Sequence, residues 1–135
     1  MGTNPGIQFV QVSLIELDFK LNKNFKLPDK GVPVDMGLDV KKSFSSDKKS
    51  LTTVLSAILF NKTTSYPFKM KVSVEGLFVS DNIKELQEFS KIHAPAHLMP
   101  FLREVIGTTT LKANIPPLLL PPFNISELLK EKRKG

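Results

Sequence analysis

The residues best suited to chemistry in this chain are two histidines, His93 and His97, which stand four positions apart. On a continuous helix this spacing would place both imidazoles on one face, as a zinc site requires. Pro95 lies between them, however, and no glutamate completes an HExxH pattern, so we expect no metal there. The sequence also lacks a GxSxG elbow, a phosphate-binding loop and a GxGxxG turn. Its carboxylates show no paired arrangement for acid–base work, and we therefore expect no enzymatic activity.

Composition favours one folded domain. The 135 residues are 41% hydrophobic, and there is no cysteine for a disulfide framework or a thiolate metal site. No apolar run approaches the roughly 18 residues of a membrane span. The N-terminal sequence lacks the basic and apolar regions of a secretory signal. We expect a single domain over residues 1–135, with flexible ends at about 1–6 and 131–135, in the cytoplasm and without direct membrane insertion.

The net charge of +6 is basic, and basic proteins often bind nucleic acid or acidic partners. Here the lysines are scattered from Lys20 to Lys132, which is more typical of a solvated surface. A nucleic-acid binder would show a salt-sensitive affinity. The sequence lacks the aromatic-interleaved basic strand of an RNA-recognition motif, so we expect no nucleic-acid partner.

Four stretches have the apolar patterns of β-strands, at about residues 7–19, 34–41, 51–60 and 68–79. In the first, a regular strand would place Ile15 and Leu17 on one face, with Leu14, Glu16 and Asp18 on the other. The third is the most apolar and should be central, covered on both faces. The fourth has one apolar face and one lysine-bearing face. Their hairpin spacing predicts an antiparallel sheet.

Helical patterns follow the strands. Asp81 or Asn82 can cap a short helix that ends at about residue 92, with Ile83, Leu86 and Phe89 facing inward.

The stretch over residues 94–129 then contains the two principal helices. The first has an apolar stripe made of Leu98, Phe101, Leu102, Val105 and Ile106. Pro95 and Pro100 should lie near its start, where a missing N–H costs least. Residues 115–123 contain four prolines and must be extended, and Asn124 with Glu127 offers a capping box for the last helix. The predicted fold class is α+β, a four-stranded antiparallel sheet followed by two principal helices.

Two C-terminal segments, MPFLREVIGTTT (99–110) and IPPLLLPPFNISELL (115–129), resemble the SecB family of protein-export chaperones. In that family a helix opens with an F-P-Y-x-R-E-x-I-like run, and a proline, an apolar residue and an asparagine lead to the last helix. Those features fall here on Met99, Pro100, Phe101, Arg103, Glu104, Ile106, Pro122, Phe123 and Asn124. VEGLFVS (74–80) and ELDFKL (16–21) are similar to segments of the family's fourth and first strands. The resemblance covers about residues 9–129.

The resemblance implies a four-stranded antiparallel sheet with two principal helices, assembled as a dimer of dimers and hence a homotetramer. It implies a cytoplasmic chaperone that holds unfolded preproteins in hydrophobic grooves before export. It also implies that no nucleotide or other cofactor takes part.

The resemblance also places candidate client-binding residues on the second strand, the proline segment and the last helix. By position these are Met36, Leu38, Val40, Leu118, Leu120, Phe123, Leu128 and Leu129. The alternative for each of them is plain core packing. For the strand residues the two interpretations are even, whereas the apolar, proline-stiffened segment favours the groove.

One departure from the family concerns its docking partner, the SecA motor. In the family an acidic patch on the solvent face of the sheet docks SecA, and Glu16 fits that pattern. The matching neighbours in this chain are Lys20, Lys69 and Lys71, and this loss of charge complementarity should disfavour SecA. SecB-like proteins also guard antitoxins of toxin–antitoxin modules. A chaperone dedicated to one antitoxin is therefore the alternative to a general export chaperone.

Overall fold

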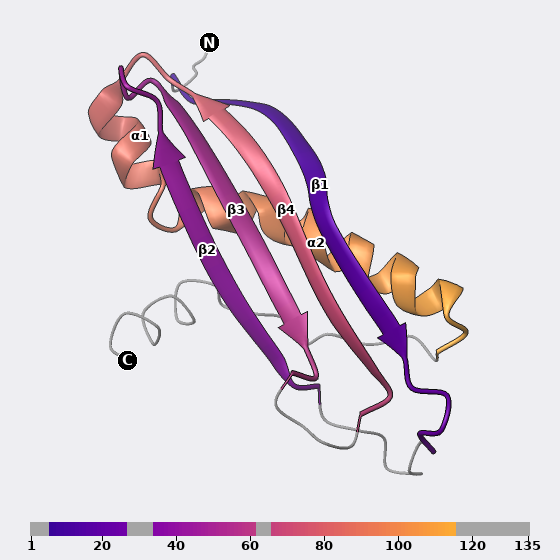
Figure 1. Cartoon of the computed structure of the whole chain (residues 1–135). Coiled ribbons are helices and arrows are strands. Elements are labelled where there is room, and N and C mark those ends of the chain that lie inside the picture. Colours follow the sequence, from indigo (N-terminus) through magenta and orange to yellow (C-terminus); the bar gives the residue numbers. More distant parts are fainter. Residues whose placement is uncertain (1–5, 27–33, 62–65, 116–135) are drawn as a thin grey trace.

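The structure, a computed structural model, describes residues 6–26, 34–61 and 66–115. Four antiparallel strands form one sheet in the order β1-β4-β3-β2, and two helices lie on one side of it (Figure 1). The elements are β1 (Gln8–Leu21), β2 (Met36–Phe44), β3 (Ser50–Leu59), β4 (Phe68–Val79), α1 (Ile83–Phe89) and α2 (His93–Lys112). The predicted sheet followed by helices is confirmed. The predicted proline segment, last helix and flexible C-terminal end lie outside the described residues.

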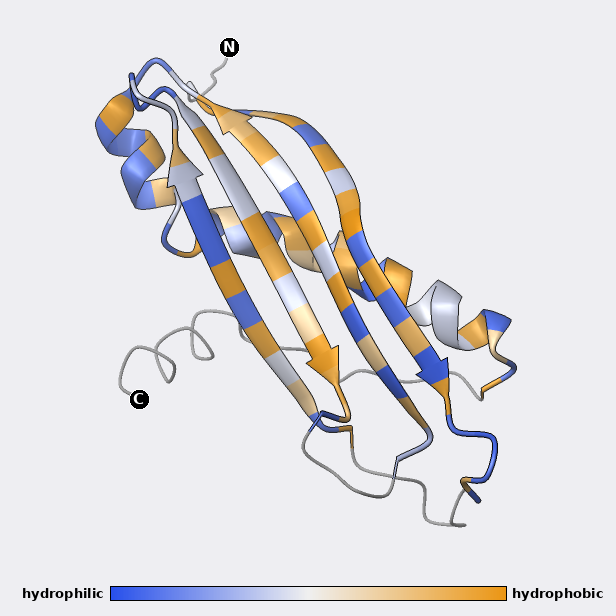
Figure 2. Cartoon of the chain, viewed as in Figure 1, coloured by the Kyte–Doolittle hydropathy of each residue, from blue (hydrophilic) through white to orange (hydrophobic). Residues whose placement is uncertain are grey.

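The core lies between the sheet and α2, which packs mainly against β3 and β4. Alternate side chains of both strands are buried on this face, because successive residues of a strand point to opposite sides. The hydropathy of the strands alternates accordingly in Figure 2. The predicted central position of β3 is confirmed. Its predicted coverage on both faces is wrong, since Val54 and Ile58 on the other face are only half-buried.

The first strand differs from its sequence prediction because it is not regular. The pairing of β1 with β4 shifts register between Phe9 and Gln11 and again between Leu14 and Glu16. Each shift inserts one extra residue, as in a β-bulge, and reverses the faces of the residues that follow. Leu14 and Leu17 therefore share the helix-facing side of the sheet, whereas Glu16 lies on the opposite side. The predicted separation of Leu14 from Leu17 is wrong.

The short helix α1 begins where the sequence predicts. The Asn82 side chain accepts a hydrogen bond of 3.0 Å from the backbone N–H of Glu85, which satisfies one free donor of the first turn. Leu86 is fully buried, as expected, but Ile83 is exposed. The helix also ends at Phe89, earlier than predicted, and the Ser90 hydroxyl donates to the Gln87 carbonyl at this end.

The long helix α2 begins at His93, before its predicted stripe, so Pro100 lies inside it rather than near its start. Leu98, Leu102 and Ile106 are fully buried against the sheet, as predicted. Phe101 was predicted to join them but is 40% exposed.

The helix lies close to β4 at Gly76. A Cβ atom at this glycine would come within 2.6 Å of Leu98 Cδ2. A glycine at this point of β4 therefore allows the buried helix to approach the strand.

The hairpin between β2 and β3 is closed by polar side chains. The Ser45 hydroxyl donates to Asp47 Oδ1 at 2.6 Å, and the backbone N–H of Lys49 donates to the same oxygen at 3.0 Å. Hydrogen bonds stabilise the charged form, so they lower the pKa of the Asp47 carboxyl. This local closure fixes the register of β2 on β3.

Candidate binding surfaces

The strand residues of the predicted groove lie together on β2, an edge strand of the sheet. Met36, Leu38 and Val40 are half-buried and pack against the border of the core on the helix-facing side. They pair in register with three fully buried residues of β3, Leu59, Ala57 and Leu55. The outer side of β2 pairs with no other strand of the described sheet. An apolar row thus lies on the last strand of the described sheet, where an extended peptide could lie alongside it.

This apolar row ends at Lys42, two positions beyond Val40 on the same face. Its Nζ atom donates to the Ser90 hydroxyl at 3.3 Å, which connects β2 to the end of α1. The other predicted groove residues, Leu118, Leu120, Phe123, Leu128 and Leu129, lie outside the described residues. The structure therefore brings together the three β2 candidates alone.

The four predicted docking residues lie on the opposite, solvent-exposed face, on β1 and β4. Lys71 Nζ lies 3.5 Å from Glu16 Oε1, and both side chains are about half exposed. Lys20 pairs in register with Lys69, whose Nζ lies 4.8 Å from the centre of the Tyr66 ring. These residues do share one face, as the prediction requires. Their charges are mixed, and the one acidic member already has a lysine partner.

The other edge strand, β1, exposes much more apolar surface than β2. The helix-facing side chains of β1 are poorly covered, because α2 packs mainly on β3 and β4. Leu14 and Leu17 are 48% and 44% exposed, and Ile15, the extra residue at the second bulge, is 50% exposed. The exposed large apolar residues of this strand are Phe9, Val10, Leu14, Ile15, Leu17 and Leu21. Contiguous apolar exposure of this kind typically marks an interaction surface.

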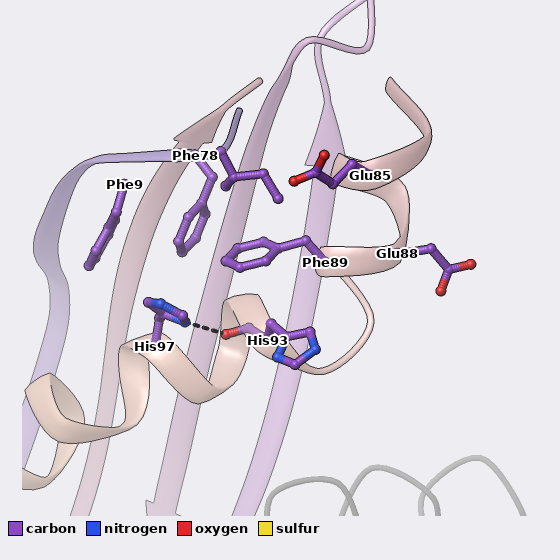
Figure 3. A pocket seen from close by; sticks show the side chains of 8 residues that line it. Phe9, Phe78, Glu85, Glu88, Phe89, His93 and His97 are labelled. Carbon is purple, nitrogen blue, oxygen red and sulfur yellow. Dashed lines mark hydrogen bonds between the residues drawn. The ribbon is translucent and has the colours of Figure 1, made fainter. Parts of the chain in front are cut away.

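A third feature is a hollow of about 510 Å³ where β1, β4, α1 and the start of α2 meet. We call it the aromatic pocket (Figure 3). Its lining residues are Ile7, Phe9, Phe78, Glu85, Glu88, Phe89, His93 and His97.

The rings of the aromatic pocket contact one another. Phe9 stacks on Phe78 with ring centres 4.8 Å apart, and Phe89 meets Phe78 edge to face at 5.1 Å. Phe89 also lies 5.3 Å from the ring of His97. A hydrogen bond of 2.8 Å joins His97 Nδ1 to the carbonyl oxygen of His93 and fixes the His97 ring at the pocket wall. The two histidines thus belong to an aromatic wall.

Sequence reasoning considered these histidines only as metal ligands and missed the pocket. One signal was available, because Phe89, His93 and His97 follow one another at intervals of four residues. The contribution of Phe9 and Phe78 was harder to find, because it depends on the bulged register between β1 and β4.

The described parts of the chain offer no other obvious chemical centre. Within residues 6–26, 34–61 and 66–115, no three His, Cys, Asp or Glu side chains are grouped to hold a metal ion. None of the helices in these ranges has the length and hydropathy needed to cross a membrane. The surfaces above are therefore the features to interpret.

Comparison with protein families gives a match to preprotein translocase subunit SecB over residues 8–135. An uncharacterized protein of Methanocaldococcus jannaschii is 25% identical over 130 residues, which cover 91% of this chain and 82% of that protein. The protein-export protein SecB of Rickettsia typhi is 26% identical over 107 residues, covering 77% of this chain and 70% of the relative. SecB of Neorickettsia sennetsu is 33% identical over 73 residues, and the match spans only 44% of its length.

A solved structure is similar in fold. It is a SecB-like chaperone of Mycobacterium tuberculosis in complex with a ChAD peptide from the HigA1 antitoxin. The TM-score is 0.65 at 16% sequence identity, and the alignment covers 87% of this chain and 91% of that one. At this identity the likeness concerns the fold, namely a four-stranded antiparallel sheet with helices on one face.

Proposed function

The chain belongs to the SecB family, and we propose that it is an ATP-independent holdase that binds unfolded chains or preproteins in hydrophobic grooves. Proteins of this family are chaperones without enzymatic activity. We further propose that it acts in the cytoplasm and that its clients are destined for export.

The observation that carries this proposal is the half-buried apolar row of Met36, Leu38 and Val40 on β2, at the border of the core. The apolar side chains of an extended client would cover this row. Burial of apolar area is worth about 25 cal/mol per Å² before the costs of ordering, and it is non-directional. Affinity would therefore depend weakly on client sequence, as a holdase needs.

We include in the proposed groove the leucines and phenylalanine of the C-terminal region. These are Leu118, Leu120, Phe123, Leu128 and Leu129. Leu118, Leu120 and Phe123 are supported by their sequence, in which prolines exclude a helix and leave bulky apolar side chains on a stiff chain. Leu128 and Leu129 are supported by their place in the predicted amphipathic last helix.

For the assembly we propose a homotetramer built as a dimer of dimers. The exposed apolar side chains of β1 support this proposal, because a monomer in water gains by covering such a surface. A second copy paired along β1 would also satisfy the unpaired backbone groups of this edge. Several grooves on one particle would then bind several segments of the same client and raise the overall affinity.

The charge pattern bears on the partner that receives the client. Lys20, Lys69 and Lys71 stand on the solvent face where an acidic docking patch was expected, and Glu16 is paired with Lys71. We propose that SecA docks weakly, if at all, because complementary charge is missing.

The alternative function is a chaperone dedicated to the antitoxin of a toxin–antitoxin module. Two observations favour it: the charge pattern disfavours SecA, and the solved structure of similar fold holds an antitoxin peptide. Such a protein would use the same grooves but prefer one client.

A titration against several unrelated unfolded proteins tests the proposal and separates the two functions. Similar affinities for all of them support the general holdase, and one client bound far more tightly supports the dedicated chaperone. No binding to any of them would contradict both. In the same assay, the double variant Leu118→Ser with Leu120→Ser should weaken binding while the oligomer stays intact. If the oligomer dissociates instead, these leucines are core residues.

A further inference from the structure

The solvent face of the sheet carries two lysines that the fold places directly opposite each other. Lys20 on β1 pairs in register with Lys69 on β4, and both side chains are exposed. Like charges that face each other across two paired strands destabilise a sheet. Lys69 Nζ lies over the Tyr66 ring, whereas within the described parts of the chain Lys20 makes neither a hydrogen bond nor an ion pair. The stability of the fold therefore does not account for this pair.

The two lysines line a hollow of about 300 Å³ on this face, which we call the lysine hollow. Lys71, Asp18 and the half-buried Ile58 also line it. Lys71 lies 3.5 Å from the carboxylate of Glu16 and pairs in register with Asp18, so its charge is offset. The excess positive charge of the hollow thus comes from the two opposed lysines, and Ile58 adds an apolar patch on the same face.

A second hollow adjoins the lysine hollow, and its charge is of opposite sign. It shares Ile58 and Asn61 with the lysine hollow, and its other lining residues, which include Asp35 and Asp39, lie in and around β2 and β3. Positive and negative charges are therefore separated across this part of the face. A long polyanion such as RNA that crossed the sheet would meet the two aspartates and be repelled. A short acidic segment, in contrast, can lie over the lysines alone.

We propose that the lysine hollow docks a short acidic segment of a partner protein. Its carboxylates would pair with Lys20 and Lys69, and a neighbouring apolar side chain would cover Ile58. Each ammonium is a point charge on a flexible stem, so aspartate and glutamate would both be accepted. The C-terminal sequence of this chain, KEKRKG, is itself basic and does not have the complementary charge. This inference goes beyond the proposed function, in which the solvent face takes part in neither client binding nor assembly.

Two labelled peptides test the proposal, acetyl-GSDELEDGS and its neutral counterpart acetyl-GSNQLQNGS, which has nearly the same shape. The wild-type protein should bind the acidic peptide about tenfold more tightly by fluorescence anisotropy, because two or three exposed ion pairs act together. Added salt should reduce this preference, since exposed charges are screened.

The double variant Lys20→Gln with Lys69→Gln should lose most of the preference, with little change for the neutral peptide. The matched control is Lys84→Gln with Lys112→Gln. It removes the same charge from exposed positions of α1 and α2 and should keep the preference.

A second measurement separates docking from a structural role of the lysines. Lys20→Gln removes one member of the like-charge pair, so the free energy of unfolding in urea should stay the same or rise. The affinity for the acidic peptide should fall in the same variant. If stability and affinity fall together, Lys20 supports the fold and the proposal is overturned.

Equal affinity of the wild-type protein for both peptides would also overturn the proposal. So would a preference that survives in the Lys20 and Lys69 double variant, or one that falls equally in the control, since that result reflects net charge alone. A labelled oligouridine that binds more tightly than the acidic peptide and displaces it would assign the lysines to nucleic acid instead.

The holdase function is tested separately with the same double variant, which should still delay the aggregation of unfolded clients. If it does not, although the wild type does, the lysines belong to the client surface and the docking proposal fails. If neither protein delays aggregation but the preference for the acidic peptide holds, the holdase function fails and the docking site stands.

Discussion

The two edges of the sheet, β1 and β2, are built differently. β1 has 14 residues and two bulges, and six of its large apolar side chains are exposed. β2 has 9 residues in regular register, and its apolar side chains are half-buried at the border of the core. Neither edge pairs with a further strand of the described sheet. The two edges differ chiefly in how much apolar surface each of them exposes.

This difference indicates two kinds of contact. The large apolar surface of β1 costs free energy while it faces water, so it suits a lasting contact such as a second copy of the chain. The smaller row on β2 is already partly covered, so the monomer tolerates its exposure between binding events. Such a surface suits clients that bind and leave. On this basis we propose that β1 serves assembly and that β2 serves client binding.

The largest expected effect concerns assembly through β1. The double variant Leu14→Asp with Leu17→Asp places two charges on the exposed apolar face and should abolish the proposed tetramer. Light scattering coupled to size-exclusion chromatography measures the mass of the particle. As a control, Ile83→Asp changes an exposed apolar residue of α1 and should leave the mass unchanged. If the double variant keeps the particle mass of the wild type, β1 is not part of the interface.

The next prediction compares how much a core residue and an edge residue contribute to the free energy of unfolding. Leu55 is fully buried on β3, so Leu55→Ala should lower the free energy of unfolding by about 2–5 kcal/mol. Leu21→Ala at the exposed end of β1 makes the same chemical change and should cost less than about 1 kcal/mol. Urea unfolding of dilute protein measures both values. Equal losses would mean that the edge residue is as well packed as the core.

A smaller effect tests β2 as the client surface. The double variant Met36→Ser with Leu38→Ser removes apolar area from the row and should weaken the binding of an unfolded client about tenfold, or roughly 1.4 kcal/mol. The particle mass should not change, because these residues are assigned to client binding. Unchanged client affinity together with lower stability would show that Met36 and Leu38 act only as core residues.

The smallest effect concerns the charged face. The ion pair between Glu16 and Lys71 is about half exposed, so Glu16→Gln should change the free energy of unfolding by less than about 1 kcal/mol. Neither assembly nor client affinity should respond, because this face takes part in neither proposed contact. Urea unfolding and the same binding assay check both expectations. A strong loss of client binding in this variant would mean that clients bind on the solvent face.

Much of the fold was predictable from local patterns. The alternation of apolar and polar residues in β4 predicts which face is buried and which bears lysines. Asn82 predicts where α1 begins. The apolar stripe predicted for α2 is buried at Leu98, Leu102 and Ile106. In each case a short-range period or a cap determines the structure, so neighbouring residues are sufficient evidence.

The errors arise where distant residues decide the outcome. The bulges of β1 depend on pairing with β4 and cannot be read from a strand that is apolar on both faces. The exposure of Phe101 depends on where α2 crosses the sheet; its ring lies 5.9 Å from that of Phe9 rather than in the core. For the candidate site, the alternation over residues 34–41 predicted the strand, and the family resemblance proposed its apolar row as part of the groove. The aromatic pocket was missed because four elements contribute to it.

The most direct test of the central claim is the aggregation of a slowly refolding protein, followed by light scattering with this chain added and nucleotide absent. The protein, added below stoichiometric amounts, should delay aggregation, and ATP should make no difference, because the proposed apolar grooves bind clients passively. Aggregation that proceeds at the same rate with and without the protein, for several unrelated clients, would contradict the account.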